Sequence, residues 1–246
     1  MAASASTVET ASTVKPNRVK PGVAPLRAGQ GYSFVLRRLH SLSGIVPIGA
    51  FLLEHFISNA ESAHGVQAYN DQVKFLTGLP FVHVLEWVFI FIPLAFHGLY
   101  GLYIWYRGES NVKEYPWTGN WMYFAQRWTG IIAFVYIGYH VWDMRFSGVH
   151  LMGGGYNAAF SKVWFAFQNP WQVALYIIGI TAASWHFSYG VWLFAAKWGF
   201  TVGDKARRKF GYVCFALAIV LVGVGLWSVG GFLSTPRSQV PIIEHD

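Results

Sequence analysis

Four histidines lie inside apolar stretches of the chain: His55 in FLLEHF, His97 in FHGLYGLYIW, His140 in YIGYHVW and His186 in SWHFSYGVW. In such surroundings an imidazole forms a hydrogen bond within the packed segment, passes on a proton or binds a metal. A single histidine of this kind is more often a packing residue. Four of them, with the pattern His-x-x-Tyr-Gly present at both His97 and His186, favour a set of metal ligands.

The composition describes the environment that must position these histidines. Of 246 residues, 54% are hydrophobic, 18% are aromatic and only 12% are charged, and the mean hydropathy is +0.36. This is the composition of a membrane protein. Apolar runs of about 20 residues, enough to cross a bilayer, occur at 39–58, 81–106, 125–146, 171–196 and 210–233. We therefore expect an all-α integral membrane bundle with five transmembrane helices, the first two kinked at Pro47 and Pro93.

The basic residues predict how this bundle is oriented. Fourteen of the 18 Lys and Arg residues precede the first span or lie in the connections between spans two and three and between spans four and five. By the positive-inside rule, we expect the N-terminus to be cytoplasmic and the C-terminus to face outward. The pI near 9.5 thus requires no nucleic acid as a partner.

Three regions follow from this reading. Residues 1–30 are rich in Ala, Ser, Thr, Val and Pro and lack the apolar core of a signal peptide, so we expect a flexible cytoplasmic arm. Residues 31–235 form the predicted transmembrane domain. Residues 236–246 form a short tail on the outer side.

The depth of each histidine in its span separates the four into two levels. His55 and His140 lie roughly 20–25 Å from the cytoplasmic ends of their helices, and His97 and His186 lie roughly 22–25 Å from the outer ends of theirs. The hydrocarbon layer is about 30 Å thick. We therefore expect His97 to pair with His186 nearer the cytoplasm and His55 to pair with His140 nearer the outside, with the two levels roughly 15 Å apart.

An internal repeat supports this pairing. The segment SGIVPIGAFLLEH (43–55) is similar to TGIIAFVYIGYH (129–140), and HGLYGLYIW (97–105) is similar to HFSYGVWLF (186–194). Spans one and two thus recur as spans three and four. In a parallel repeat of this kind, equivalent histidines lie at equal depth.

The ligand chemistry of two imidazoles per level favours haem. Zinc usually takes four protein ligands, and a di-iron site needs carboxylates. Cys214 is the only cysteine, which excludes a thiolate cluster and covalent haem attachment, so iron–sulfur clusters must belong to a partner. A six-coordinate haem iron takes four bonds from the porphyrin and needs two axial imidazoles. Gly101 and Gly190, four residues after His97 and His186, would leave room for the macrocycle on the same helix face.

Other polar residues near the membrane have weaker claims to a role. Contacts with a haem propionate or a quinone are expected at the cytoplasmic mouth from Arg37, Arg38, His40 and Arg127, with lipid headgroups as the alternative. Glu86 and Glu54 lie towards the outer side. Each is a candidate for proton exchange with a quinone, with simple extension of the carboxylate to water as the alternative. We expect the remaining histidines to be solvated or interfacial: His64, His83, His150 and His245.

Four segments together resemble the five-helix, two-haem cytochrome b subunit of bacterial succinate dehydrogenase and fumarate reductase. They are RRLHSLSGIVPIGAFLLEH, IPLAFHGLYGLYIW, NWMYFAQRWTGIIAFVYIGYHVW and NPWQVALYIIGITAASWHFSYGVW, and the resemblance covers about residues 33–233. It implies axial ligands at His55, His97, His140 and His186. It also implies an FAD-containing flavoprotein and an iron–sulfur subunit on the cytoplasmic side, with menaquinone as the usual lipid-soluble partner.

The resemblance implies a relay of electrons in which succinate is oxidised in the flavoprotein. Electrons would pass through the clusters to the haem at His97–His186, then to the haem at His55–His140, and to quinone. Alternatives are fumarate reduction, a di-haem anchor of a hydrogenase or formate dehydrogenase, a transporter, or a purely structural anchor. The quinone site stays open between the outer end near Glu86 and the cytoplasmic end near His40 and Arg38. The oligomeric state is not readable from the sequence.

Overall fold

The computed structural model describes residues 30–147 and 155–241 of the chain. All the regular elements in these two ranges are helices. The described residues leave out 1–29 of the predicted N-terminal arm, 242–246 of the predicted tail, which include His245, and the segment with His150.

The first predicted span consists of two consecutive helices, α1 (Gln30–Ile45) and α2 (Pro47–Ala60). The helix is interrupted at Val46, whose N–H still donates to the carbonyl of Leu42 at 2.9 Å. Pro47 has no N–H to continue the helical ladder, and its ring fits the first turn of a helix, where no such donor is needed. The interruption therefore lies where Pro47 predicts it.

The second predicted span also changes its winding near a proline. It begins with the short α4 (Val82–Leu85), continues as the π-helical turn η2 (Glu86–Phe91) and becomes α5 (Ile92–Arg107), with Pro93 in the first turn of α5. A π-helical turn has one more residue per hydrogen-bonded ring than an α-helix, and such turns often occur at functional sites. Here the wider turn begins at Glu86.

The remaining predicted spans are long helices. They are α6 (Thr118–Val141), which is continued by the π-helical η3 (Trp142–Phe146), α8 (Pro170–Lys197) and α9 (Asp204–Ser234). At the start of α8, the side chain of Asn169 accepts a hydrogen bond from the N–H of Trp171 at 3.0 Å. Pro170 follows at the first helical position, so this start has both a capping side chain and a favourable proline.

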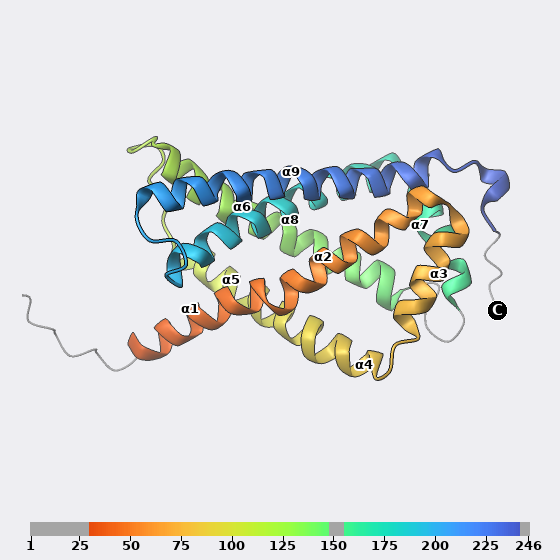
Figure 1. Ribbon diagram of the computed structural model, residues 1–246, viewed down its shortest axis with the longest axis horizontal. Coiled ribbons are helices and arrows are strands. Elements are labelled where there is room, and N and C mark those ends of the chain that lie inside the picture. Colours follow the sequence, from red (N-terminus) through yellow and green to blue (C-terminus); the bar gives the residue numbers. More distant parts are fainter. Residues whose placement is uncertain (1–29, 148–154, 242–246) are drawn as a thin grey trace, which may run out of the picture.

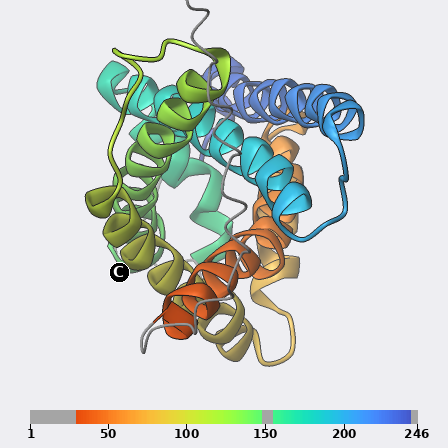
Figure 2. The ribbon, with the colours of Figure 1, turned by 90° about the vertical axis from the view of Figure 1, so that its left-hand side faces the viewer.

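These helices run side by side along the long axis of the molecule and alternate in direction (Figure 1). Helix α8 packs against α6, α9 and α1, while α1 also packs against α5 and α2 against α9. Seen from one end, the helices surround the long axis, with α8 between α6 and α9 (Figure 2). The chain enters at the end that holds the connections from α5 to α6 and from α8 to α9. This is the end predicted to face the cytoplasm.

Five short elements close the opposite end of the bundle, and the sequence analysis did not anticipate them. They are η1 (Glu61–His64), α3 (Val66–Thr77), η4 (Gly155–Ala158), α7 (Ala159–Ala166) and η5 (Arg237–Gln239). Asn70 joins α3 to η4 and α7, because its amide nitrogen donates to Asn157 O at 2.8 Å and its amide oxygen accepts from the N–H of Phe160 at 2.9 Å. The best-buried aromatic core lies here: Tyr69, Tyr136, Phe160, Trp164, Phe167, Tyr176 and Phe232.

Within the described residues, three helical segments are long and apolar enough to cross a membrane: Ser33–His64, Val82–Arg107 and Asp204–Ser234. The helices α6 and α8 have 24 and 28 residues, so they have the length of a span. Their mean hydropathy is lower because Trp, Tyr, Gln and His occupy many of their positions. The most apolar window of Val82–Arg107 has no buried residue, which suits a segment whose side chains contact lipid or another bound group.

Candidate functional site

The fold brings the four deep histidines together as two separate pairs. The ring centroids of His97 and His186 are 6.2 Å apart, and those of His55 and His140 are 5.6 Å apart. Each ring is contributed by a different helical span, and these are the two pairs expected from depth along the spans. The rings within each pair lie nearly at right angles, at 86° for the inner pair, His97 and His186, and 72° for the outer pair, His55 and His140.

Backbone carbonyls orient both rings of the inner pair. The Nδ1–H of His97 donates to His40 O at 2.9 Å, and the Nδ1–H of His186 donates to Gln126 O at 3.0 Å. Because a carbonyl can only accept, each contact places the proton on Nδ1. Nε2 of each ring then keeps its lone pair for a metal, in the arrangement by which proteins usually fix a ligating imidazole.

Two side chains lie directly beside the inner pair. The ring of His40 stacks on His97 with a centroid distance of 4.0 Å and an interplanar angle of 10°. The amide of Gln126 donates to His186 O at 3.0 Å, and its Oε1 is buried without a hydrogen-bond partner. The sequence analysis placed His40 at the cytoplasmic mouth and did not select Gln126.

Gly101 and Gly190 do not face open space. A Cβ on Gly101 would lie 3.2 Å from Nε2 of His40, and one on Gly190 would lie 3.6 Å from Nε2 of Gln126. The room that the sequence analysis expected at these two glycines is therefore partly taken by the side chains beside the inner pair.

Side chains, and not backbone carbonyls, surround the outer pair. The Nδ1 atom of His140 lies 3.1 Å from the hydroxyl of Tyr176, while the ring of Tyr136 stacks near His140. The amide of Asn59 donates to His55 O at 2.8 Å, lies 3.3 Å from Nδ1 of that ring, and accepts from the hydroxyl of Tyr69 at 3.2 Å. The amide nitrogen of Asn59 can only donate, but it also lies 3.4 Å from Nε2 of His55 and so does not select one nitrogen of that ring. The hydroxyl of Tyr176 can donate or accept, which leaves the tautomer of His140 open.

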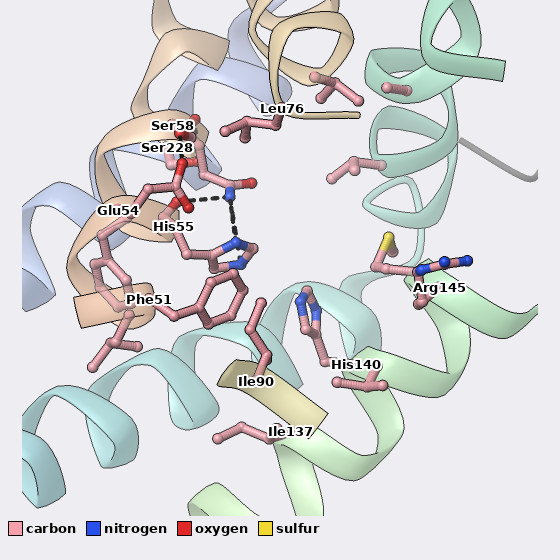
Figure 3. A pocket seen from close by; sticks show the side chains of 18 of the residues that line it. Phe51, Glu54, His55, Ser58, Leu76, Ile90, Ile137, His140, Arg145 and Ser228 are labelled. Atoms are coloured by element: carbon pink, nitrogen blue, oxygen red, sulfur yellow. Dashed lines mark hydrogen bonds between the residues drawn. The ribbon is translucent and has the colours of Figure 1, made fainter. Parts of the chain in front are cut away.

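A cavity of about 500 Å³ contains the outer pair. His55 and His140 project into it from opposite sides, with Phe51, Ile90 and Ile137 on its walls (Figure 3). Most of the lining is apolar, as in typical sites for small molecules and cofactors. Its polar lining gathers towards the short outer elements: Glu54, Ser58, Asn59, Gln72, Glu86, Arg145, Lys162 and Ser228.

Glu86 is paired with a basic residue from the next span. Its two carboxylate oxygens accept from Nε and Nη2 of Arg145 at 3.2 and 3.0 Å. The side chains are only 19% and 29% exposed, so the pair is partly withdrawn from water. His83 approaches the same carboxylate at 3.6 Å. Glu86 thus lies on the cavity wall in a bidentate ion pair with Arg145. Its carboxylate does not simply extend into water, which was the alternative expected from the sequence.

Two further polar groups on the cavity wall have partners within the protein. The carboxylate of Glu54 accepts from the hydroxyl of Ser58, which in turn accepts from the amide of Gln72 at 2.9 Å. In the outer connection, the ammonium of Lys162 donates to Ser147 O at 2.7 Å. Burial lowers the pKa of Lys162, and the nearby carboxylate of Asp143 acts in the opposite direction.

The basic residues predicted to lie at the cytoplasmic mouth have structural partners of their own. Arg127 donates from Nη2 to the carbonyls of Trp105 and Gly108 at the end of α5, the second at 2.7 Å. The guanidinium of Arg38 lies over the ring of Trp198 at 4.9 Å. Arg37 is exposed. Whether any of them contacts a propionate or a quinone stays a prediction, as it does for His40.

The two remaining histidines that the structure describes outside the pairs lie at the surface. The side chains of His64 and His83 are both 66% exposed. His64 lies 2.9 Å from the carboxylate of Glu61. Both positions suit the solvated or interfacial role expected of them.

The donor set fits a cofactor that brings its own equatorial ligands. Across 30–147 and 155–241, no cluster of three or more His, Cys, Asp or Glu side chains could hold a bare metal ion. Two metal–nitrogen bonds of about 2 Å, together with the two ring radii, add up to roughly 6 Å, which is close to the separations of the ring centroids in both pairs. The residues present therefore fit haem better than zinc or a di-iron centre.

The partners of these histidines were largely invisible in the sequence. Gln126 and His40 act through backbone carbonyls, which every residue carries. Tyr176 and Arg145 are reached across the bundle, at separations of 36 and 59 residues from His140 and Glu86. One signal was available for Arg145, because a carboxylate within a span requires a partner and Arg145 is a nearby cation on the outer side.

Comparison with known proteins agrees with these features. Residues 110–225 match the family described as succinate dehydrogenase/fumarate reductase transmembrane subunit. Over 200 residues, the chain is 37% identical to the succinate dehydrogenase cytochrome b558 subunit of Bacillus subtilis (strain 168), in an alignment that covers 81% of this chain and 97% of that protein. From this similarity we conclude that the chain belongs to the family of membrane-anchor subunits of succinate dehydrogenase and fumarate reductase.

Proposed function

We propose that the chain is a five-span cytochrome b that binds two non-covalent b haems and connects a succinate dehydrogenase to quinone. His97 and His186 would hold the inner haem, and His55 and His140 the outer haem. The observation that carries the proposal is the presence of two imidazole pairs with centroid separations of 6.2 and 5.6 Å, each formed between different spans. The similarity of the motifs within spans one and two to those within spans three and four supports an internal repeat.

The bound haems would supply one-electron carriers at two depths of the membrane. The contribution of this chain would be to hold each haem between two imidazoles, one from each of two different spans. The carbonyls of His40 and Gln126 hold the inner rings with Nε2 unprotonated. The apolar spans around both pairs keep water away, which strengthens the hydrogen bonds that orient the rings.

The outer cavity supports a quinone site at the outer end of the bundle. It is lined by Glu86, Arg145 and Lys162. Beside a quinone, a carboxylate or an amine can exchange protons, and a guanidinium can stabilise negative charge. At the cytoplasmic end, His40 and Arg38 already stack on His97 and Trp198. A haem held by His55 and His140 would take the part of the cavity beside these rings, so we place menaquinone or another quinone next to it, at the charged outer wall of the cavity, and not at the cytoplasmic mouth.

The proposed complex has further subunits on the cytoplasmic side. The excess of Lys and Arg on the connections at that end supports a cytoplasmic N-terminus and an outer C-terminus in a bacterial cytoplasmic membrane. An FAD-containing flavoprotein and an iron–sulfur subunit would dock there and carry out the succinate chemistry. In this proposal residues 31–235 form the membrane domain, between the arm at 1–30 and the tail at 236–246.

The direct test is a dithionite-reduced minus oxidised visible spectrum of the purified complex, with haem quantified per chain. We expect two b haems in the wild type and one in each of the variants His97→Ala and His140→Ala. His64→Ala, at an exposed histidine, is the matched control and should keep both haems. A wild-type complex without haem would contradict the proposal.

The electron donor is tested on the same preparation. Reduction of the haems by succinate, and not by formate or hydrogen, is expected for a succinate dehydrogenase. Reduction by formate or hydrogen alone would instead identify an anchor for another oxidoreductase. Rapid oxidation of the reduced haems by fumarate would favour a fumarate reductase.

A further inference from the structure

A glycine and a backbone carbonyl one helical turn apart support the ring of His97. The carbonyl of His40 accepts from Nδ1–H of His97 at 2.9 Å and from the hydroxyl of Ser43 at 3.0 Å. The hydroxyl of Ser43 also lies 3.4 Å from that Nδ1. A Cβ on Gly44 would collide with Cε1 of His97 and would lie 2.9 Å from its Nδ1. The ring can occupy its place only because residue 44 has no side chain.

The same arrangement supports His186 from α6. The carbonyl of Gln126 accepts from Nδ1–H of His186 at 3.0 Å. The hydroxyl of Thr129 lies 3.3 Å from that carbonyl and 2.7 Å from the carbonyl of Ala125, to which it makes its shorter hydrogen bond. A Cβ on Gly130 would lie 2.7 Å from Cε1 and 3.0 Å from Nδ1 of His186. Thus a carbonyl, a hydroxyl three residues later and a glycine four residues later recur in the same order around both inner rings.

Close packing of helices alone does not account for these two glycines. Elsewhere in the bundle, Gly98 lies against the ring of Phe134 and Gly179 against the ring of Tyr136, and there the glycine only makes room for an apolar ring. At Gly44 and Gly130 the ring belongs to a candidate ligand and is also hydrogen-bonded to the helix that carries the glycine. Neither His55 nor His140 is among the nearest neighbours of a glycine in the described chain.

We propose that Gly44 and Gly130 are positioning residues, each of which, with the carbonyl four residues before it, fixes the depth and rotation of one inner histidine. A methyl group at either position must push the ring away from its helix. The ring then loses the hydrogen bond that keeps the proton on Nδ1 and leaves Nε2 unprotonated. Loss of such an orienting contact typically weakens metal binding about 10–100-fold. The inference rests on the proposed function, because it assigns a role in holding the inner haem.

The test compares Gly44→Ala and Gly130→Ala with Gly138→Ala in the complete complex. Gly138 lies on α6, is exposed and has no atom within 4 Å of an added Cβ. The readouts are haem per chain, the low-spin electron paramagnetic resonance signals and the midpoint potential of each haem. We expect both test variants to lose the inner haem, or to show about 10–100-fold weaker retention of it together with a changed low-spin signal. The outer haem reports that the bundle still folds, and Gly138→Ala should match the wild type.

Two milder variants decide the matter if the alanine variants fail to assemble. Ser43→Ala and Thr129→Ala remove the hydroxyls near the same carbonyls without adding volume. A changed potential or low-spin signal of the inner haem alone supports the proposal. The proposal would be overturned if Gly44→Ala and Gly130→Ala left the inner haem unchanged in content, potential and low-spin signal. If the alanine variants at the two glycines do not assemble, the same unchanged result in Ser43→Ala and Thr129→Ala would overturn it. A wild-type complex that lacks haem would instead refute the proposed function, so the two failures are distinguishable.

Discussion

The inner and outer histidine pairs are built differently although both consist of two imidazoles from different spans. The inner rings donate to the carbonyls of His40 and Gln126, which belong to helices and cannot turn away. The outer rings contact the amide nitrogen of Asn59 and the hydroxyl of Tyr176, which belong to side chains that can change rotamer. Helix packing therefore fixes the inner pair, whereas the outer pair lies in surroundings that can adapt.

The space around the two pairs differs in the same sense. The outer pair lies in a cavity of about 500 Å³ with charged groups on its outer wall, and a folded cap of short helices closes that end. At the inner pair, His40, Gly44 and Gly130 lie directly against the rings. This contrast suits a fixed electron carrier at one depth and, at the other, a carrier beside a site where quinone and protons are exchanged.

The largest expected effects come from removing one ligand of each pair. We expect His186→Ala to abolish binding of the inner haem and His55→Ala to abolish binding of the outer haem, because the remaining imidazole of each pair would have to hold its haem alone. Haem per chain and the two midpoint potentials measure this outcome. If either variant lost both haems while the complex stayed assembled, the two pairs would not be independent sites.

The ion pair on the outer wall should contribute measurably to stability. Glu86→Gln leaves Arg145 without its carboxylate partner in partly buried surroundings, and we expect a loss of roughly 2 kcal/mol, less than for a fully buried pair. Thermal or denaturant unfolding in detergent measures the change. Arg145→Gln and the double variant complete the cycle, and strict additivity would show that the pair contributes nothing.

A smaller effect is expected at the partner of His140. Tyr176→Phe removes the hydroxyl that lies 3.1 Å from Nδ1 of His140 and keeps the ring that packs in the core. We expect about tenfold weaker retention of the outer haem, at the lower end of such effects, with the inner haem unchanged. Haem content after dilution into detergent is the measurement. A response confined to the inner haem would reverse the comparison between the pairs.

The smallest effect is expected for Arg127, at the inner end of the bundle. Its guanidinium satisfies the carbonyls of Trp105 and Gly108 where α5 ends. Arg127→Ala should lower the unfolding free energy by about 1 kcal/mol and leave both haem spectra unchanged. The exposed Arg37 gives the control variant Arg37→Ala. A shifted inner-haem potential in Arg127→Ala alone would instead assign Arg127 to a propionate.

The positions of the deep histidines could be predicted because they depend on two strong signals, the length of apolar runs and the rise of a helix. All five predicted runs fall in helices. The π-helical turns at Glu86 and Trp142 could not be predicted, because no distinct residue pattern precedes them. The short helices α3 and α7 were missed for a related reason: they depend on packing against each other and the ends of the spans.

The details of the candidate site were predictable only in part. The four candidate histidines can be identified from the sequence. Most of the groups that orient their rings come from other helices and cannot be identified in this way. Gly44 and Gly130 occupy equivalent places in the repeated motifs SGI and TGI, so the repeat marked them without revealing what they contact. The expectation of open space at Gly101 and Gly190 ignored the side chains of a neighbouring helix, which helix periodicity cannot supply.

The pair between Glu86 and Arg145 also bears on how the chain is made. Glu86 is synthesised 59 residues before Arg145, so the second span, which ends at Arg107, is complete before its cation has been added to the chain. Insertion of a carboxylate into lipid without a partner costs free energy. Glu86 begins the π-helical turn η2, near the outer end of the second span. Stable insertion of the second span should therefore await the third, which makes a helical hairpin, and not a single helix, the unit of biogenesis.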